Sequence, residues 1–426
     1  MRVLILGSPT SKGNQSFGIK TPVVGGGWVE NLIDSISKEK NLEIFALFYA
    51  DFCAEVCMKE LDGVHYIALP ARIRTLARCS REMVLDLRKA VDLAKPDVVH
   101  IIGTEREHAL RLAEIAGFEK TILSVTGMVS VIAQHYYGGI NPRKFLIPSI
   151  GDIYRRGGPI KERNTFRRLG RYETELISRA RYVMGRTTWD YACVKQINPN
   201  IQYIYCGEVL NSAYQENEWT IENCERYRIF LSQASYPLKG LHKMLEAFPL
   251  ILNQYPEAEI YVAGPNILKS DTIMDRIKRT TYSNYIGKLI RKYKIDLAKI
   301  HFTGPLSSGE MLEQYLKCNV FVLPSAIENS PNSLGEAMSL GVPCVASCVG
   351  GVQDMVTDRE DGFVYPFDES YMLAHYVCRI FAHNKIAKEL SCQAQKNAKK
   401  RFNAEQVKQT TVEAYMSIYC HLKEEV

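Results

Sequence analysis

The sequence of 426 residues lacks the patterns that define several classes of protein. Its twelve cysteines are scattered, with no Cys-x-x-Cys pair and no Cys/His cluster at zinc-ligand spacing, which excludes a disulfide-rich miniprotein and a zinc ribbon. No run approaches the roughly 18 apolar residues of a membrane span. Low-complexity segments and short-period repeats are also missing. With 46% hydrophobic and 23% charged residues, the composition is that of an ordinary globular protein rather than a disordered or collagen-like chain.

The beginning of the chain lacks the features of a secretory signal peptide. Met-Arg-Val-Leu-Ile-Leu-Gly contains only four consecutive apolar residues, and no small-residue cleavage site follows. This start predicts a buried strand. We expect a cytoplasmic protein whose thiols are reduced and mostly buried. The stretch Gly7-Ser8-Pro9 after this strand also lacks the Gly-x-Gly-x-x-Gly fingerprint, which disfavours a dehydrogenase.

The positive charge is confined to one part of the chain. The formal charge is +6, from 53 Lys+Arg and 47 Asp+Glu. Residues 143–195 hold 13 basic and 5 acidic side chains, whereas residues 1–142 are neutral with 16 of each. A local excess of this kind indicates a local anionic partner rather than a protein that coats nucleic acid.

Short apolar runs alternate with amphipathic stretches along the chain, a pattern typical of strand–helix–strand units with a parallel sheet covered on both faces. A polar stretch near residues 206–226 interrupts the pattern, and residues from 369 onward are predicted to be helical. The sequence therefore predicts an α/β protein with two Rossmann-like domains. The expected strands are Val3–Leu6, Ile44–Phe48, Val98–Ile102, Thr121–Val125 and Tyr182–Met184, then Arg228–Leu231, Glu259–Val262, Lys299–Phe302, Val320–Leu323, Pro343–Ala346 and Gly362–Tyr365.

The most informative motif lies between Val320 and Asp368. A strand is expected to end at Pro324, a loop carries Glu328, and a helix begins near Ser333 with Glu336 in its first turn. Two carboxylates at this spacing could face one ligand, because carboxylates pair with sugar and ribose hydroxyls while a helix N-terminus favours phosphate. The alternative for Glu336 is structural, since Ser333-x-x-Glu336 has the spacing of a capping box.

The combined motif resembles the retaining, nucleotide-sugar-dependent glycosyltransferases of family 4. Glu-x7-Glu is followed by Glu-Ala-Met-x-x-Gly-x-Pro-x-Val-Ala-Ser, Gly-Gly and Asp-Gly-Phe-x-Tyr-Pro. The resemblance implies the GT-B fold, with two Rossmann-like domains facing each other across a cleft. It also implies an acceptor-binding domain at 1–206, a donor-binding domain at 207–405, and a C-terminal helix at 406–426 that packs back on the first domain.

The resemblance assigns roles to two candidate catalytic residues, Lys239 and Glu328. Lys239, in a Lys-Gly pair after a predicted strand, corresponds to the lysine that contacts the donor diphosphate. A cation there stabilises the charge that builds up on a departing diphosphate. The family usually has an arginine nearby, where this chain has Gln233.

Further donor-binding residues follow from the same resemblance. They are Gly26 and Gly27 in a glycine loop, Gly304 near the base, and Asn332, Ser333, Leu334 and Glu336 at the helix start. No cofactor and no metal are expected, because no Asp-x-Asp stands at a strand end and a lysine with a helix N-terminus would take the metal's place.

Candidate phosphate or acceptor contacts are Arg186, Thr126 and His135. Arg186 closes a predicted strand and could clamp a phosphate, or instead pair with Asp190 for structure. Thr187 or Thr188 could cap the following helix. Many family members have a histidine where this chain has Thr126-Gly127, which leaves His135 as a candidate without an assigned role as base.

The resemblance implies a nucleotide-sugar donor and a glycan or lipid-linked saccharide acceptor, with a hexosyl unit transferred during bacterial surface polysaccharide synthesis. A basic flank suits a phosphate-bearing acceptor at the inner face of an anionic membrane, where residues 72–81 could also lie, although an ordinary solvated helix face explains them equally well. Two alternatives remain: a non-catalytic nucleotide-sugar-binding subunit of a synthase complex, and a GT-B-type sugar-nucleotide epimerase or phosphorylase.

Overall fold

The computed structural model describes residues 1–20, 27–71 and 79–424. Its contacts divide the chain into two compact units. The first unit comprises Met1–Val131, Arg167–Asn211 and Phe402–Val426, and the second comprises Ile132–Phe166 and Ser212–Arg401. The chain thus leaves and re-enters each unit, so residues 132–166 group with the segment expected to bind the donor.

The first unit contains an eight-stranded sheet, sheet A, in the order β3-β4-β2-β1-β5-β6-β7-β8. All its pairs are parallel except β3 with β4, so the predicted parallel sheet is confirmed. The strand order reverses between the adjacent strands β1 and β5, which makes their carboxyl ends a natural binding crevice. The strands are β1 (Arg2–Leu6), β2 (Glu43–Ala50), β3 (Cys57–Leu61), β4 (Val64–Pro70), β5 (Val98–Ile102), β6 (Thr121–Ser124), β7 (Tyr182–Gly185) and β8 (Gln202–Tyr205).

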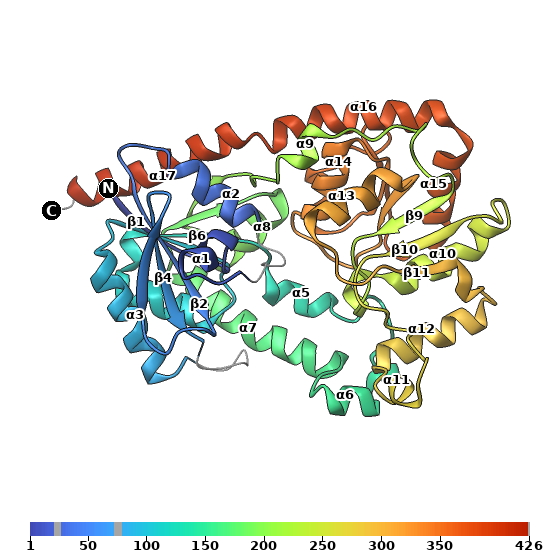
Figure 1. The fold of residues 1–426 in the computed structure, drawn as a ribbon, viewed down its shortest axis with the longest axis horizontal. Coiled ribbons are helices and arrows are strands. Elements are labelled where there is room, and N and C mark those ends of the chain that lie inside the picture. The colour runs from blue at the N-terminus through green and yellow to red at the C-terminus, as the bar shows by residue number, and fades with distance from the viewer. Residues whose placement is uncertain (21–26, 72–78, 425–426) are drawn as a thin grey trace. The chain divides into compact units, whose positions relative to one another are not determined.

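Helices cover both faces of sheet A because its strands are apolar on both sides. Leu4 and Leu6 of β1 pack in one core, and Val3 and Ile5 pack in the other. The first core includes residues of α3, α4 and α8, and the second includes residues of α2 and α17, which lie along each other (Figure 1). The helices of the first unit include the short α1 (Ser11–Ser16), and α2 (Gly27–Ile36), α3 (Arg81–Ala94), α4 (Glu107–Ala116), α8 (Thr188–Ile197) and α17 (Ala404–Glu424).

The second unit contains a fully parallel six-stranded sheet, sheet B, in the order β11-β10-β9-β12-β13-β14. This is the order of the doubly wound Rossmann fold, and the crevice of such a sheet lies between β9 and β12 at their carboxyl ends. The strands are β9 (Arg228–Leu231), β10 (Glu259–Val262), β11 (Ile300–Phe302), β12 (Val320–Leu323), β13 (Cys344–Ser347) and β14 (Phe363–Tyr365).

Nine helices belong to the second unit, and two further helices, α5 and α7, span the division between the units. Those nine are α6 (Ile150–Tyr154), α9 (Ala213–Glu216), α10 (Leu241–Leu252), α11 (Ile273–Ile277), α12 (Thr281–Lys292), α13 (Ser308–Lys317), α14 (Asn332–Leu340), α15 (Ser370–Ala382) and α16 (Asn384–Arg401). The other two are α5 (Val129–His135) and α7 (Pro159–Arg179). Short 3-10 helices are η1 (Phe118–Lys120), η2 (Pro142–Phe145), η3 (Pro237–Lys239), η4 (Leu297–Lys299) and η5 (Gly350–Asp354).

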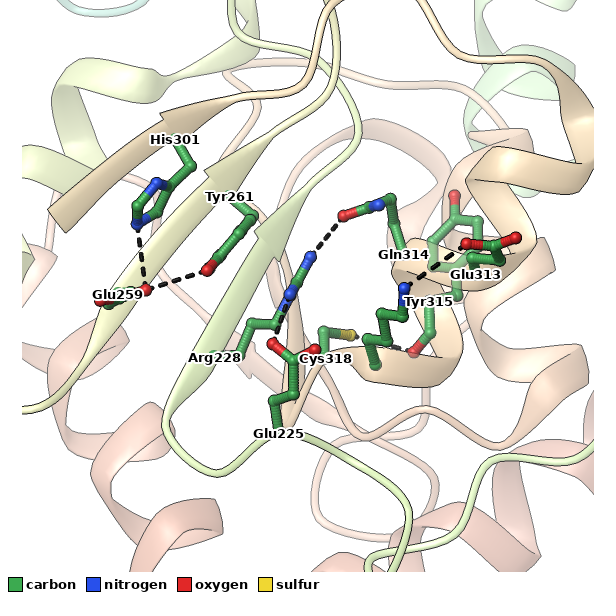
Figure 2. A network of polar contacts seen from close by, with 10 residues as sticks. Glu225, Arg228, Glu259, Tyr261, His301, Glu313, Gln314, Tyr315 and Cys318 are labelled. Carbon is green, nitrogen blue, oxygen red and sulfur yellow. Dashed lines mark hydrogen bonds and ion pairs between the residues drawn. The ribbon is translucent and has the colours of Figure 1, made fainter. Parts of the chain in front are cut away.

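The amino ends of β9, β10 and β11 carry a network of polar contacts, shown in Figure 2. The Arg228 guanidinium bonds Glu225 and Gln314 and lies 3.5 Å from the ring centroid of Tyr261. Glu259 accepts hydrogen bonds from the Tyr261 hydroxyl at 2.9 Å and from His301 Nε2 at 3.0 Å. Most of these groups pair with one another, although Arg228 Nε is buried without a hydrogen-bond partner among the described residues. A ligand of such a sheet binds at the opposite, carboxyl edge.

The structure tests two expectations from the sequence, that the thiols are mostly buried and that no segment spans a membrane. All twelve cysteines are free, but four are buried and three are exposed, so the expectation of mostly buried thiols is wrong. Among the described residues, no helix combines the length and apolar character needed to cross a membrane. Residues 72–78, most of the stretch expected to contact lipid, lie outside the described residues.

Candidate active site

The loop after β9 delivers Lys239 to the carboxyl edge of sheet B. The loop ends in η3, and Gly240 then adopts a left-handed conformation with a φ of 73° before α10 begins. A Cβ on Gly240 would lie 1.6 Å from the carbonyl oxygen of Pro324, in the loop after β12. The two loops are also joined directly, since the Ala326 N–H donates to the Leu238 carbonyl at 2.8 Å. A glycine at position 240 is therefore required where the loops meet.

Glu328 lies in the loop after β12, and its backbone is fixed by the next loop. Ala326 and Ile327, which precede it, are buried. The Gly351 N–H donates to the Glu328 carbonyl at 3.0 Å, and a Cβ on Gly350 would lie 1.9 Å from that same oxygen. The Gly350-Gly351 pair allows the loops after β12 and β13 to approach this closely. The position of Glu328 is thus set by three adjacent strands.

The structure brings together the two residues predicted to be catalytic. Lys239 Nζ donates to Glu328 Oε1 at 2.6 Å, and the two side chains are 19% and 12% exposed. Burial lowers the pKa of the Lys239 ammonium, but the Glu328 carboxylate outweighs burial, so the pKa lies above its usual value and the lysine stays charged. The site therefore holds a cation and a carboxylate between β9 and β12, where a Rossmann-like sheet binds its ligand.

The start of α14 differs from the capping-box alternative. The helix begins at Asn332 after Pro331, which makes no side-chain cap bond, so Ser333 is inside the helix and not its N-cap. The Tyr315 hydroxyl, fully buried, lies 3.0 Å from Glu336 Oε2 and 3.1 Å from the Ser333 carbonyl oxygen. The capping-box explanation of Glu336 is wrong, because Ser333 is not the N-cap of α14. The Glu336 carboxylate instead contacts the hydroxyl of a tyrosine from α13.

Leu334 and Gly304 are placed by their backbones. The Leu334 side chain is fully buried and its N–H donates to the Pro331 carbonyl at 3.0 Å. Gly304 follows β11 with a φ of 81° and exchanges backbone hydrogen bonds of 2.9 and 3.1 Å with Gly264 after β10. A Cβ on Gly304 would meet nothing within 4 Å. Both glycines border the same carboxyl edge of sheet B as Lys239 and Glu328.

Segment 132–166 supports the lysine loop within the second unit. His242, two residues after Gly240, is buried and donates from Nε2 to the Gly138 carbonyl at 2.7 Å, while the Tyr282 hydroxyl lies 3.3 Å from Nδ1. A Cβ on Gly138 would lie 2.4 Å from the Pro237 carbonyl oxygen. Burial lowers the pKa of His242 to about 4, so a neutral imidazole holds this contact.

In the first unit, Arg186 is engaged by residues other than the predicted partner. Its guanidinium pairs with Glu208 and lies 4.4 Å from the ring centroid of Trp28, and the Arg186 and Glu208 side chains are 6% and 1% exposed. Asp190 instead accepts the Arg186 backbone N–H at 2.9 Å and forms a capping box with Thr187. The cap prediction for Thr187 is confirmed, and the suggested pairing of the Arg186 side chain with Asp190 is replaced by Glu208.

The remaining predicted residues are dispersed. Gly26 lies outside the described residues, and Gly27 is the first residue of α2. His135 is exposed at the end of α5 and belongs to the second unit. Thr126 follows β6 in the first unit, where it lines a cavity.

That cavity, of about 400 Å³, lies at the reversal point of sheet A. It is bordered by the ends of β1 and β5 and by polar residues that include Glu105, Arg106, His108 and Thr126. The Glu105 Oε2 atom is buried without a hydrogen-bond partner among the described residues. A cavity with an unsatisfied carboxylate oxygen offers an acceptor for a ligand hydroxyl.

Sequence reasoning missed Tyr315, Glu208 and Glu105. Tyr315 lies 18 residues before Ser333 and Glu208 lies 22 residues after Arg186, so no local spacing connects either pair. Glu105, three residues after the end of β5, could have been found, because polar residues that follow a parallel strand face the binding edge. Among the described residues, no group of three His, Cys, Asp or Glu side chains could hold a metal ion.

Two curated relatives show what the sequence is similar to. The chain is 29% identical over 123 residues to sulfoquinovosyl transferase SQD2 of Arabidopsis thaliana, which covers 29% of this chain and 20% of that protein. It is 24% identical over 167 residues to the capsular polysaccharide biosynthesis glycosyltransferase CapM of Staphylococcus aureus, covering 39% of this chain and 40% of that protein. The chain spans less than half the length of either relative.

Solved structures share the fold along the whole chain. Sucrose-phosphate synthase from Thermosynechococcus elongatus aligns with a TM-score of 0.70 at 16% identity, covering 99% of this chain and 100% of that one. HepE from Anabaena, in complex with UDP and glucose, aligns with a TM-score of 0.64 at 15% identity, covering 98% and 100%. Together with the two parallel sheets, these neighbours confirm the predicted GT-B fold.

The residues that match a known family include the candidate site. Residues 214–401 match the family described as glycosyl transferases group 1. This stretch carries sheet B, Lys239, Glu328 and α14. The predicted family resemblance is confirmed as a match of residues 214–401, the part of the chain that holds the lysine–glutamate pair, to the glycosyl transferases group 1.

Proposed function

We propose that the protein is a retaining glycosyltransferase that moves a hexosyl unit from a nucleotide-diphosphate sugar to a glycan or lipid-linked acceptor. The observation that carries the proposal is the Lys239–Glu328 ion pair at the crevice of sheet B, within the residues that match the glycosyl transferases group 1. A charged lysine suits a diphosphate, and a carboxylate suits the hydroxyls of a sugar.

In the proposed reaction, the bond between the anomeric carbon and the β-phosphate oxygen breaks, and its electron pair leaves with the nucleoside diphosphate. Lys239 stabilises this charge, and Glu328 accepts hydrogen bonds from the sugar and stabilises positive charge at the anomeric carbon. The acceptor oxygen bonds to the same face of that carbon, and its proton passes to the leaving phosphate. Glu336, oriented by Tyr315, is proposed to bind donor hydroxyls next to Asn332 and Ser333 of α14.

The cavity at the reversal point of sheet A is proposed to take part of the acceptor. Its volume of about 400 Å³ is large enough for a sugar ring, and Glu105 and Thr126 provide polar atoms for hydroxyl groups. The relative CapM is named for capsular polysaccharide biosynthesis and the neighbour HepE was solved with UDP and glucose. The first supports a bacterial surface polysaccharide as product, and the second supports a nucleotide-sugar donor.

One observation favours the second candidate, a non-catalytic nucleotide-sugar-binding subunit. Lys239 is neutralised by Glu328, and Gln233 stands where the resemblance implies a second cation, so the diphosphate would receive less stabilisation than in a complete site. Such a subunit would bind a nucleotide sugar without cleaving it.

The test is to incubate the protein with a panel of nucleotide sugars and measure nucleoside diphosphate release, with and without candidate acceptors. The transferase predicts release with at least one donor, and its loss in both Lys239→Ala and Glu328→Gln. Binding of a nucleotide sugar without release would instead support the non-catalytic subunit. Product analysis by NMR, showing the same anomeric configuration as in the donor, tests retention.

A further inference from the structure

The second unit exposes an unusual cluster of large apolar side chains. Among the described residues, the six most exposed of these side chains all come from two short segments, α6 with the residues just before it, and α11. Ile147 is 85% exposed and Ile273 is 78% exposed. We call the cluster the apolar face; its members are Leu146, Ile147, Ile150, Ile153, Tyr154, Ile273, Met274 and Ile277.

The two segments of the apolar face are packed against each other, as α6 and α11 are in Figure 1. Ser149 Oγ donates to the Arg279 carbonyl at 2.8 Å, and a Cβ on Gly151 would lie 2.3 Å from the carbonyl oxygens of Lys278 and Arg279. Lys278 Nζ lies 5.3 Å from the ring centroid of Tyr154. Asp152, almost fully buried, accepts the Thr281 N–H at 3.1 Å. The two segments therefore lie side by side, and the exposed apolar side chains of both belong to neighbouring parts of the surface.

Basic residues predominate in both segments. Residues 143–163 contain six basic and two acidic side chains, and residues 269–279 contain four basic and two acidic ones. Of the acidic groups, Asp152 is buried in the contact between the segments and does not offset the surface charge. The exposed cations near the apolar face include Arg143, Lys144, Arg155, Arg156 and Arg276. Apolar side chains beside a positive surface match an anionic lipid bilayer.

A cavity opens beside the apolar face. It has a volume of about 540 Å³ and is lined by apolar side chains, including Phe145, Leu146 and Ile153, and by the polar residues Asp152, Arg156, Lys161 and Asn164. This combination suits a lipid better than a protein surface, since an acyl chain can enter the apolar part while the cations contact the headgroup phosphate.

We propose that the apolar face docks the protein onto an anionic membrane. Its isoleucines enter the headgroup boundary while the surrounding arginines and lysines bind lipid phosphates. A soluble protein rarely exposes so many large apolar side chains together unless they meet a partner. The inference goes beyond the proposed transfer reaction and needs no activity for its test. It retains part of the basic flank that the sequence indicated, adds residues 269–279, and does not involve residues 72–81.

The proposal is tested by flotation with vesicles of phosphatidylcholine alone and with 30% phosphatidylglycerol added, a composition chosen as roughly that of an anionic membrane. The wild type is expected to float with the anionic vesicles, and less so in 0.5 M salt, because salt screens the charge attraction. Ile147→Asp/Ile150→Asp and Lys144→Glu/Arg155→Glu are each expected to weaken binding about tenfold or more. Leu297→Asp is the control, since Leu297 is 60% exposed but lies in η4.

Three results would overturn the proposal. They are no binding by the wild type, equal weakening by Leu297→Asp, or self-association in analytical ultracentrifugation that Ile147→Asp/Ile150→Asp abolishes without any vesicle binding. The last result would assign the apolar face to a second copy of the chain. Circular dichroism of each variant shows that the fold is intact, which is expected because the substituted side chains are exposed. Nucleoside diphosphate release in solution is measured separately, so failure of one proposal leaves the other testable.

Discussion

Lys239 and Glu328 lie 89 residues apart in the chain and form a 2.6 Å ion pair between the ends of β9 and β12. Two glycines allow the backbone to bring the pair together. Gly240 lets the loop after β9 contact Pro324, and Gly350 lets the loop after β13 contact Glu328. A donor diphosphate would compete with Glu328 for the lysine. The free carboxylate would then be available for the sugar.

Replacing Lys239 with alanine is expected to lower the rate of nucleoside diphosphate release by about 10²–10³-fold, because a preorganised group that stabilises the leaving charge is lost. The measurement is a coupled assay at saturating donor. Lys243→Ala is the matched control, because Lys243 lies one helical turn further on and pairs with Glu246 at 3.2 Å. If Lys239→Ala and Lys243→Ala lower the rate of nucleoside diphosphate release to the same extent, a direct role for Lys239 is refuted.

Gly240→Ala is expected to destabilise the protein by at least about 2 kcal/mol, since alanine would be strained at a φ of 73° and its Cβ would overlap the Pro324 carbonyl. Urea denaturation measures the free energy of unfolding. Gly309→Ala, in α13 with nothing within 4 Å of its Cβ position, should leave stability unchanged or slightly raised. An unchanged midpoint for Gly240→Ala would contradict the described contact of the two loops.

Tyr315→Phe removes the hydroxyl that orients Glu336 and fills the same space. We expect KM for the nucleotide sugar to rise several-fold with a smaller change in kcat, because Glu336 is proposed to bind the donor. Steady-state kinetics measures both. Tyr214→Phe serves as the comparison, since Glu336 also acts electrostatically on Tyr214, but the Tyr214 hydroxyl donates its hydrogen bond to the Ser308 carbonyl oxygen, at 3.3 Å. Equal effects of the two substitutions would show that only packing is affected.

The neutral His242 predicts a loss of stability in acid. Its pKa is about 4 in the folded chain and about 6.5 when unfolded, so below pH 6.5 the unfolded state binds a proton that the folded state does not. The free energy of unfolding should therefore fall by about 1.4 kcal/mol per pH unit from this residue between pH 6.5 and 4.

This contribution is isolated by comparing the wild type with His242→Gln at pH 7.5, 6.5 and 5.5. The advantage of the wild type should shrink as the pH falls. His135→Gln, at an exposed position, is measured in parallel as a control for replacing a histidine with glutamine. If the difference in unfolding free energy between the wild type and His242→Gln stays constant from pH 7.5 to 5.5, the imidazole is not held neutral.

Much of the fold could be predicted because buried parallel strands are continuous apolar runs. Val98–Ile102, Arg228–Leu231, Glu259–Val262 and Val320–Leu323 are strands with those bounds. Strands β3, β4 and β8 were missed. β3 is largely exposed and polar at an edge of sheet A, and β8 is the opposite edge strand, so neither shows an apolar run. The Asp62-Gly63 turn between β3 and β4 was the signal that could have revealed the hairpin.

The site was predictable where one motif holds all its parts. Loop and helix residues from Glu328 to Glu336 are contiguous, so their common position follows from a single strand–loop–helix unit. The direct pairing of Lys239 with Glu328 could not be read from spacing, because it depends on β9 and β12 being neighbours in sheet B. Arg186 shows the same limit, since its partner Glu208 follows a strand that the sequence did not predict.

Titration calorimetry with UDP, GDP and ADP measures whether Lys239 receives the diphosphate of a nucleotide sugar. For the nucleotide that binds most tightly, we predict that Lys239→Ala raises Kd at least about tenfold, as expected for loss of a charge-assisted contact. We also predict that Lys243→Ala has no effect and that Glu328→Gln, which frees the lysine from its partner, does not raise Kd. An unchanged Kd in Lys239→Ala would show that Lys239 does not receive the diphosphate.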